Sequence, residues 1–314
     1  MPDVPAARRF LAEGARVLER RRAERLLEGG DGVPVRDAVA AYRTADGGFG
    51  LALEPDARSA RAHPAAISTA LRILDEEGAW DEELALGAAD WLWREAPAAT
   101  RGAGDPRLGT GGGGAVFVGP AIADAPHAPW FVPEPGLPPS PVQAGPIAAV
   151  LRRRGVAHPW LAATEPLLWA EVDRWCAEPP DPALAGVHRI GRGYALRGLL
   201  AFLESCEDGE RLERALEGLA PHVAELVDDG SGEDEAHRPL HIVPRPDARA
   251  ARYVPAATLE AALDRLAEGQ RDDGGWTFDW PAWSPAATAD WRGVMTVEAL
   301  AVLRAHGRLP SEEA

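Results

Sequence analysis

The sequence contains no lysine and no asparagine, so all 33 of its basic residues are arginine. Without lysine, the chain cannot form a Schiff base with a substrate, anchor pyridoxal phosphate or supply the lysine of a P-loop. The sequence also has no G-x-S-x-G, H-E-x-x-H or C-x-x-C motif. These absences exclude several large classes of hydrolase, metalloprotease and redox enzyme.

Cysteine and long apolar runs are also scarce. Cys176 and Cys206 are the two cysteines, and their spacing is not that of metal ligands, so we expect free thiols and no disulfide. No window approaches the roughly 18 uncharged apolar residues of a membrane span. The first 22 residues have no apolar signal core, which predicts a cytoplasmic protein without a transmembrane segment. The sequence leaves peripheral membrane contact open.

The charge balance is strongly acidic, with a formal net charge of -16. Because nucleic-acid binding needs clustered positive charge, the composition predicts no nucleic-acid partner. Hydrophobic residues make up 46% of the 314 residues, enough for one full core. We therefore expect a single domain over 1–314.

Helical periodicity dominates the chain. Long loops are expected at 96–140 and 228–255, with a lid at 120–140 and a flexible stretch at 100–114. Ala115–Val118 is the single candidate strand, and Asp81 is a candidate helix N-cap. The predicted helices cover 6–27, 34–44, 63–78, 81–95, 142–154, 158–177, 188–205, 209–227, 256–270 and 290–306.

An internal repeat links two distant segments. Asp46-Gly47-Gly48-Phe49 matches Asp273-Gly274-Gly275-Trp276, and helix-like sequence precedes and follows each copy. Paired glycines allow backbone angles closed to other residues, the aspartate can bond its own backbone, and the aromatic ring needs burial. We interpret Asp46 and Asp273 as structural residues of two equivalent turns.

The repeated motifs resemble a known superfamily. The run from Gln270 to Trp276 resembles the QW repeat of squalene-hopene cyclases and other class II terpene cyclases. Gly47-Gly48-Phe49-Gly50, followed by His63-Pro64-Ala65, is similar to the β subunits of protein prenyltransferases. The whole chain also resembles small bacterial proteins described loosely as prenyltransferase-like. The resemblance implies an all-α fold, the α/α toroid, in which helical hairpins form a ring around a central apolar cavity.

The resemblance also implies a site. In toroid relatives, the loop after the turn leads to one mouth of the cavity, which would place Glu54, Asp56, Arg58 and His63 there. The second repeat would contribute Asp279, Trp280, Trp283, Asp290, Trp291 and Arg292. Such a set suits carbocation chemistry, because an acid can protonate an alkene and π faces stabilise the positive charge. Asp56 is the preferred proton donor.

The chain departs from each relative in its chemistry. It lacks the DxDD acid motif of class II cyclases and the DDxxD magnesium motif of class I synthases, and its cysteines do not match the zinc site of protein prenyltransferases. No cofactor is therefore expected, except magnesium if the substrate is a diphosphate held by Arg58 and Arg292. The alternative for Glu54 and Asp56 is a structural brace that caps the next helix or pairs with a nearby arginine.

Three further groups carry weaker signals. Asp124 and His127 could form an acid–base pair or gate beside Trp130, or His127 could be a hydrogen-bonding strut. The acidic run 233–237 with His241 resembles a metal site but is more typical of a solvated loop. Trp160, Trp169 and Trp175 have the spacing of core residues.

Three classes of function follow. The favoured one is an enzyme of terpenoid metabolism, a cyclase or isomerase that binds an isoprenoid or other apolar small molecule. The second is a non-catalytic toroid that binds a lipid or a partner protein. The weakest is a carbohydrate-active (α/α) barrel, since those enzymes use two carboxylates and aromatic platforms.

Overall fold

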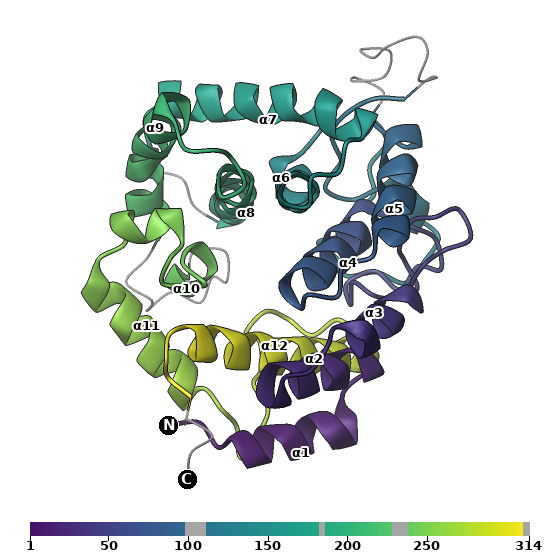
Figure 1. Ribbon diagram of the computed structural model, residues 1–314, viewed down its shortest axis with the longest axis vertical. Helices are drawn as coiled ribbons and strands as arrows, with labels where there is room; N and C mark the ends of the chain where they lie inside the picture. The colour runs from purple at the N-terminus through teal and green to yellow at the C-terminus, as the bar shows by residue number, and fades with distance from the viewer. Residues whose placement is uncertain (98–110, 182–185, 228–237, 310–314) are drawn as a thin grey trace. The chain divides into compact units, whose positions relative to one another are not determined.

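The computed structural model describes residues 1–97, 111–181, 186–227 and 238–309, and most of these are helical (Figure 1). No strand occurs among them, which confirms the all-α expectation. The prediction of a strand at Ala115–Val118 is wrong, because these residues form irregular backbone and bends. Within the described ranges, every helix is too short or too polar to form a transmembrane span.

The helices follow one another with short connections in most places. In chain order they are α1 (Val4–Gly14), α2 (Val17–Glu28), α3 (Val33–Ala40), α4 (Pro64–Glu76), α5 (Glu82–Arg94), α6 (Pro141–Arg153), α7 (Pro159–Ala177), α8 (Gly186–Leu203), α9 (Glu210–Leu226), α10 (Pro239–Ile242), α11 (Ala256–Glu268) and α12 (Pro285–Ala305). Short 3₁₀ turns cover Pro120–Ile122 and Arg249–Tyr253.

Two helix boundaries differ from those expected. The single helix over 6–27 is wrong, because Ala15 and Arg16 are extended and divide it into α1 and α2. Gly14 ends the first helix, and the Arg16 guanidinium bonds Glu19 in the first turn of the second. The last helix begins at Pro285 rather than residue 290, because Ser284 caps it. The described part of 228–255 contains α10 and a 3₁₀ turn.

Helix starts are strongly encoded in the sequence. Proline stands in the first turn of α4, α6, α7 and α12, where its missing N–H is not needed. The side chain of the residue before each of these prolines accepts a hydrogen bond from a first-turn N–H. These N-cap residues are His63, Ser140, His158 and Ser284. Asp81 caps α5 through Leu84, as expected.

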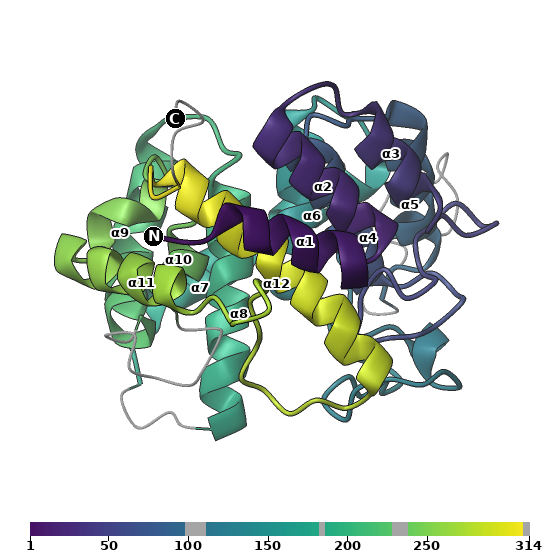
Figure 2. The ribbon, with the colours of Figure 1, turned by 90° about the horizontal axis from the view of Figure 1, so that it is seen from below.

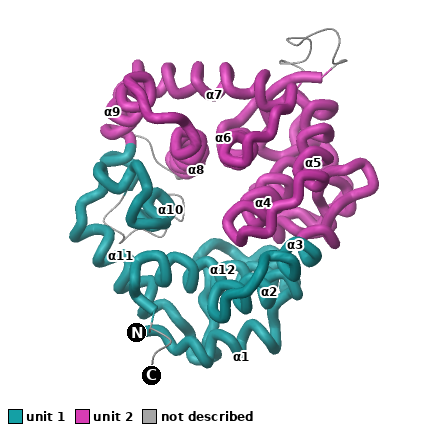
Figure 3. The backbone as a smooth tube through the Cα atoms, in the orientation of Figure 1, with its two compact units in different colours: residues 1–38, 223–314 teal, residues 39–222 magenta. Residues whose placement is uncertain are grey.

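The chain divides into two compact units, which are described separately (Figure 3). Unit 1 combines both chain ends, residues 1–38 and 223–314, and unit 2 is the continuous stretch 39–222. The boundaries fall inside α3 and α9.

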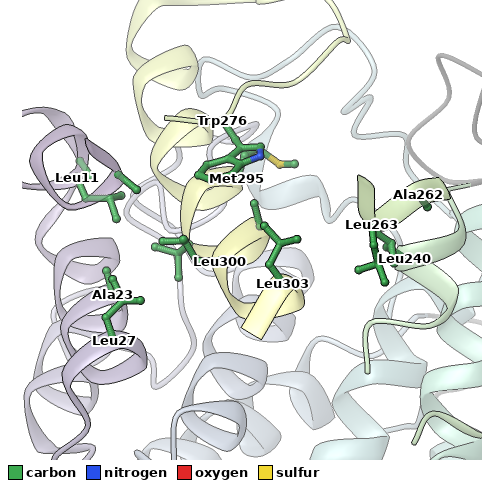
Figure 4. Close-up of a cluster of buried hydrophobic side chains, with 14 residues drawn as sticks. Leu11, Ala23, Leu27, Leu240, Ala262, Leu263, Trp276, Met295, Leu300 and Leu303 are labelled. Atoms are coloured by element: carbon green, nitrogen blue, oxygen red, sulfur yellow. The ribbon is translucent and has the colours of Figure 1, made fainter. Parts of the chain in front are cut away.

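Unit 1 joins the N-terminal helices to the C-terminal one. Both α1 and α2 pack along α12 (Figure 2), and α11 packs on its other side. The core contains Leu11, Trp276, Met295 and Leu300, with Leu240 and Leu263 from α10 and α11 (Figure 4). Segments at opposite ends of the sequence therefore share one hydrophobic core, which excludes water from their apolar faces.

Unit 2 is built around α6, which lies between α4 and α8 (Figure 1). The backbones of α6 and α8 touch, because a Cβ added at Gly145 would lie 2.0 Å from the Gly198 carbonyl oxygen. At the ends of α4 and α6, Asp75 accepts hydrogen bonds of 2.9 and 2.6 Å from Arg153 and Arg154. The C-terminal ends of α4 and α6 therefore adjoin.

The two repeated turns share one backbone structure. In unit 2, Thr44 N–H donates to the Gly48 carbonyl at 2.9 Å, and Gly47 has a φ of +93°. In unit 1, Arg271 N–H donates to the Gly275 carbonyl at 2.9 Å, and Gly274 has a φ of +92°. The aromatic rings that follow, Phe49 and Trp276, are both buried.

A helix packs against the glycines of each turn. Gly87 and Trp91 of α5 lie against the first turn, and Ala6 and Phe10 of α1 lie against the second. In both helices, a small residue precedes an aromatic one by four positions, so both fall on one helix face. The N-terminal helix α1 thus occupies, beside the last turn, the place that α5 occupies beside the first.

Candidate functional site

The candidate site begins in the loop between Gly50 and His63. Leu51 N–H donates to the Ser59 carbonyl at 2.7 Å, so the loop folds back on itself before α4 begins. Leu51 and Ala52 have φ values of 54° and 62°, in the left-handed region that residues with a Cβ rarely adopt. The loop therefore holds strain, which proteins commonly keep where backbone position matters for function.

A second segment packs on this loop from far along the chain. Ala128 N–H donates to the Asp56 carbonyl at 2.9 Å, and Arg58 N–H donates to the Pro126 carbonyl at 2.9 Å. The two segments thus form a short antiparallel bridge at Ala57 and His127. This contact joins the predicted lid segment to the loop that carries the predicted acid.

Asp56 and Trp130 meet at this junction. The indole N–H of Trp130 donates to Oδ2 of Asp56 at 2.8 Å. Asp56 is only 5% exposed, whereas Trp130 is 38% exposed. A buried carboxylate needs hydrogen-bond donors, and the indole N–H stabilises its charged form. The junction therefore holds one acid beside an aromatic ring that reaches solvent.

Residues close to Asp56 also make contacts that hold the two segments in place. An oxygen of the Glu54 carboxylate accepts a bond of 3.4 Å from Asp56 N–H, and both Glu54 and Arg58 make further contacts. His127 Nδ1 lies 2.7 Å from the Ala125 carbonyl, so this nitrogen carries the proton and donates it. No hydrogen bond joins His127 to Asp124 among the described residues, and the role of the two residues as an acid–base pair or gate stays a prediction.

His63 lies at the end of the loop and is 1% exposed. Its Nδ1 accepts the N–H of Ala66 at 3.4 Å, so the proton of the neutral ring is on Nε2. Nε2 has no hydrogen-bond partner among the described residues. Burial lowers the pKa of His63 to about 4, because the charged ring would lose its hydration.

The remaining predicted residues lie in unit 1. Trp280 stacks on Phe278 with ring centres 4.5 Å apart and meets Trp291 edge-on at 5.3 Å. Arg292 forms two bonds of 2.7 and 2.8 Å to Asp273, and its guanidinium lies 4.5 Å above the Phe10 ring. Arg292 therefore clamps the second turn.

The other members of the unit 1 set also have partners. Asp279 pairs with Arg238, and Trp283 and Asp290 make contacts of their own. The expectation that this set and the Asp56 set line one cavity stays a prediction, since they belong to different units.

An open groove of about 460 Å³ lies on unit 2 between α7 and α9. It contains Trp169, but the Arg211 guanidinium covers that ring at 3.9 Å and lies 3.5 Å from Asp173. Glu165, also in the groove, pairs with Arg152. Its acids and its aromatic face therefore already have partners.

The described residues contain no group of three or more His, Cys, Asp or Glu side chains placed to hold a metal ion. The acidic run 233–237 lies outside the described residues. So does most of the stretch 100–114 that was expected to be flexible. Trp160 and Trp175 are buried, as their spacing predicted, and Trp169 is half-buried.

Comparison with known proteins adds no relative. No protein-family model matches the chain, and no curated protein matches it at a significant level. The resemblance to toroid enzymes therefore depends on the motifs themselves.

One buried polar residue of unit 2 was missed by sequence reasoning. Gln143 stands in the first turn of α6 and is 7% exposed. A signal was present, because the chain has only two glutamines and this one interrupts the apolar run of α6. Polar residues in an apolar helix need partners or a function.

Proposed function

We propose that the chain is a terpenoid cyclase-like or prenyltransferase-like α/α toroid that binds an isoprenoid or another apolar molecule in a central cavity. Two features support the ring. The repeated turns are each followed by a helix and covered by another, and both ends of the chain share the core of unit 1. A ring of helical hairpins requires such a junction between first and last helices.

We further propose that Asp56 is the proton donor. The supporting observation is the Asp56–Trp130 bond, because N–H donation to one carboxyl oxygen stabilises the carboxylate that remains after proton loss. In the proposed step, the carboxyl O–H breaks and a C–H bond forms at one alkene carbon, while the π bond is lost. The other alkene carbon becomes cationic, and return of a proton to a base ends the reaction.

The test uses Asp56→Asn, which removes the acid but keeps an oxygen that can accept the Trp130 N–H. Purified protein is incubated with prenyl diphosphates, squalene and oligosaccharides, and products are identified by mass spectrometry. We expect an isoprenoid product from the natural chain and a loss of about 100-fold or more in the variant. The melting temperature should stay almost unchanged. An unreduced rate would remove Asp56 from the chemistry.

Glu54→Gln is the matched control, since it alters a neighbouring acid in the same loop. We expect its rate to fall far less than that of Asp56→Asn. Products from oligosaccharides alone would support the carbohydrate-active alternative instead.

A non-catalytic toroid is the second candidate. The observation that favours it is the bond from Asp56 N–H to Glu54, since both acids also hold the loop in place. On this hypothesis, isoprenoid binding is retained in Asp56→Asn and no turnover occurs in either protein. Equilibrium binding of a fluorescent isoprenoid separates this outcome from catalysis.

A further inference from the structure

One half-buried arginine of unit 2 has no anionic partner. The Nη1 atom of Arg197, on α8, is buried and donates no hydrogen bond within the described part of the chain. Its guanidinium lies 5.3 Å from the ring centre of Tyr194, and it forms no ion pair with any described carboxylate. Arginine does not lose its proton in proteins, and a buried charge is costly unless it is paired. Arg197 therefore calls for a partner that the described chain does not supply.

Arg192, on the same helix, has the partners that Arg197 lacks. Its guanidinium donates to Nδ1 of His222 at 3.2 Å, lies 3.8 Å from the Glu178 carboxylate and covers the Trp175 ring at 4.0 Å. The fold therefore supplies an acceptor, an acid and an aromatic face to one arginine of α8. Arg197 has only the aromatic contact.

The two helices that pack against α8 most extensively, α6 and α7, offer Arg197 no acid. Neither α8 nor α6 contains an aspartate or a glutamate, although 49 of the 314 residues are acidic. Each acid of α7 pairs with another arginine: Glu165 with Arg152, Glu171 with Arg174 and Asp173 with Arg211. These surroundings favour an anion that comes from outside the chain.

Arg197 lies on a face of α8 that the other helices of unit 2 leave partly open. Helical spacing puts Ile190, Tyr194 and Ala201 on the same face. Ile190 is 38% exposed, and Tyr194 and Ala201 are half-buried. Gly198 points elsewhere, since a Cβ there would meet the backbone of α6. The open face thus combines apolar side chains with a cation that has no counter-ion.

We propose that this face of α8 binds an apolar molecule that ends in a carboxylate, and that the Arg197 guanidinium holds the carboxylate. The fork of N–H groups on a guanidinium matches the two oxygens of a carboxylate. One arginine balances the single charge of that group, whereas a diphosphate carries more negative charge than one arginine neutralises. The inference rests on the proposed binding of an apolar molecule and adds its charged group. It does not require proton donation by Asp56.

The test measures binding of geranic acid and of geraniol to the full chain by calorimetry at pH 7. The two molecules share one carbon skeleton and differ in the charged group. We expect the natural chain to bind the acid at least about tenfold more tightly than the alcohol. Arg197→Met should remove this difference and leave geraniol binding unchanged. Arg197→Lys should weaken acid binding less, because it keeps the charge and loses only the fork.

Arg214→Met is the matched control, because the Arg214 side chain on α9 is 68% exposed and pairs with Glu210. It should bind both molecules as the natural chain does.

The outcomes separate this inference from the proposed function. If neither molecule binds the natural chain, both fail. If the acid and the alcohol bind equally tightly, or if Arg197→Met binds the acid as the natural chain does, only the carboxylate site fails. Tighter binding of geranyl diphosphate, with the same dependence on Arg197, would assign the site to phosphate esters and overturn the carboxylate.

Thermal stability gives a second readout. If Arg197 serves a ligand, Arg197→Met without ligand should melt at an equal or higher temperature than the natural chain, since an apolar group replaces an unpaired cation. Geranic acid should raise the melting temperature of the natural chain more than that of the variant. A lower melting temperature of Arg197→Met, together with an unchanged effect of geranic acid, would assign Arg197 a structural role only.

Discussion

The two repeated turns have the same backbone but are held by different side chains. In unit 2, the Trp91 indole N–H donates to Asp46 at 3.0 Å, and Arg94 donates to the Asp46 carbonyl. In unit 1, the Arg292 guanidinium binds Asp273 with two bonds. The local turn is therefore fixed by its own residues, whereas the clamp comes from α5, which covers the first turn, and from α12, which follows the second.

The segments that follow the turns differ more. The connection from Gly50 to His63 is longer than the one from Thr277 to Ser284, and it contains Leu51 and Ala52 in the left-handed region. It also carries Asp56. The difference between the repeats thus coincides with the candidate site.

The largest difference in stability between the two repeats should come from alanine substitutions at the turn glycines. A Cβ at Gly274 would lie 2.3 Å from the Ala6 carbonyl oxygen, and one at Gly47 would lie 3.2 Å from that of Gly87. Both substitutions also force alanine into a positive φ. We expect Gly274→Ala to lower the free energy of unfolding by about 4 kcal/mol and Gly47→Ala by about 2 kcal/mol, measured in urea.

Gly307→Ala is the control for this pair, because its φ is +68° and nothing lies near an added Cβ. Its cost should be about 1 kcal/mol, from the backbone alone. Equal costs at Gly274 and Gly47 would contradict the tighter packing of α1 on its turn.

The helix caps after the two turns should differ in their pH dependence. Buried His63 caps α4 and has a pKa of about 4, below the usual 6.5, so the unfolded chain binds its proton more readily. The contribution of neutral His63 to the free energy of unfolding is therefore complete above pH 6.5. It is lost as the pH falls toward 4, and the loss amounts to about 3 kcal/mol. Ser284 caps α12 without a titrating group.

Urea unfolding at pH 7, 5.5 and 4 checks this. His63→Asn should flatten the dependence of the free energy of unfolding on pH between pH 6.5 and 4. Ser284→Asn should leave this pH dependence unchanged. An unaltered slope in His63→Asn would show that another group titrates.

The clamps on the turn aspartates should respond alike to acid but differently to salt. Hydrogen bonds from Arg292 lower the pKa of Asp273. Burial alone would raise the pKa of Asp46, but bonds from Thr44 and Trp91 outweigh it, so that pKa is also lowered. The stability that each ionised aspartate contributes is present above the unfolded-state pKa of about 3.9. It is lost as the pH falls through the lower pKa that the aspartate has in the folded protein.

Asp273→Asn should cost about 1 kcal/mol, because half of that side chain is exposed and water screens the pair. The cost should shrink in 1 M salt. Asp46→Asn should show a cost that salt does not change, because its indole partner is neutral. The measurement is urea unfolding with and without salt, and equal salt effects would contradict the contrast.

The smallest effect concerns the loop that only the first repeat has. Leu51→Gly should raise the free energy of unfolding by up to about 1 kcal/mol, because glycine relieves the left-handed strain more than it adds unfolded-state entropy. Thr277→Gly, after the second turn, should be neutral or destabilising. A loss of stability in Leu51→Gly would show that the loop is not strained.

Much of the helical structure could be predicted from the sequence. Apolar spacing placed most of the long helices, and Asp81 was recognised as a cap because its signal is local. The break at Ala15 and Arg16 was missed, because alanine and arginine favour helices and only the packing of two short helices on α12 reveals the need for a bend.

The candidate site was predictable only in part. Asp56 and Trp130 were both singled out, but their hydrogen bond joins positions 74 residues apart, which no local pattern encodes. Gln143 was missed because its burial depends on the helices that pack against α6, which are far away in the sequence.

By itself, the sequence determined the helices, their proline-marked starts and the two glycine turns, because each depends on bonds between residues a few positions apart. The tertiary structure alone decided which side chain clamps each turn, which acid is buried beside an indole and which donors are left without partners. Those outcomes depend on packing between distant segments, where burial makes every polar group either satisfied or costly.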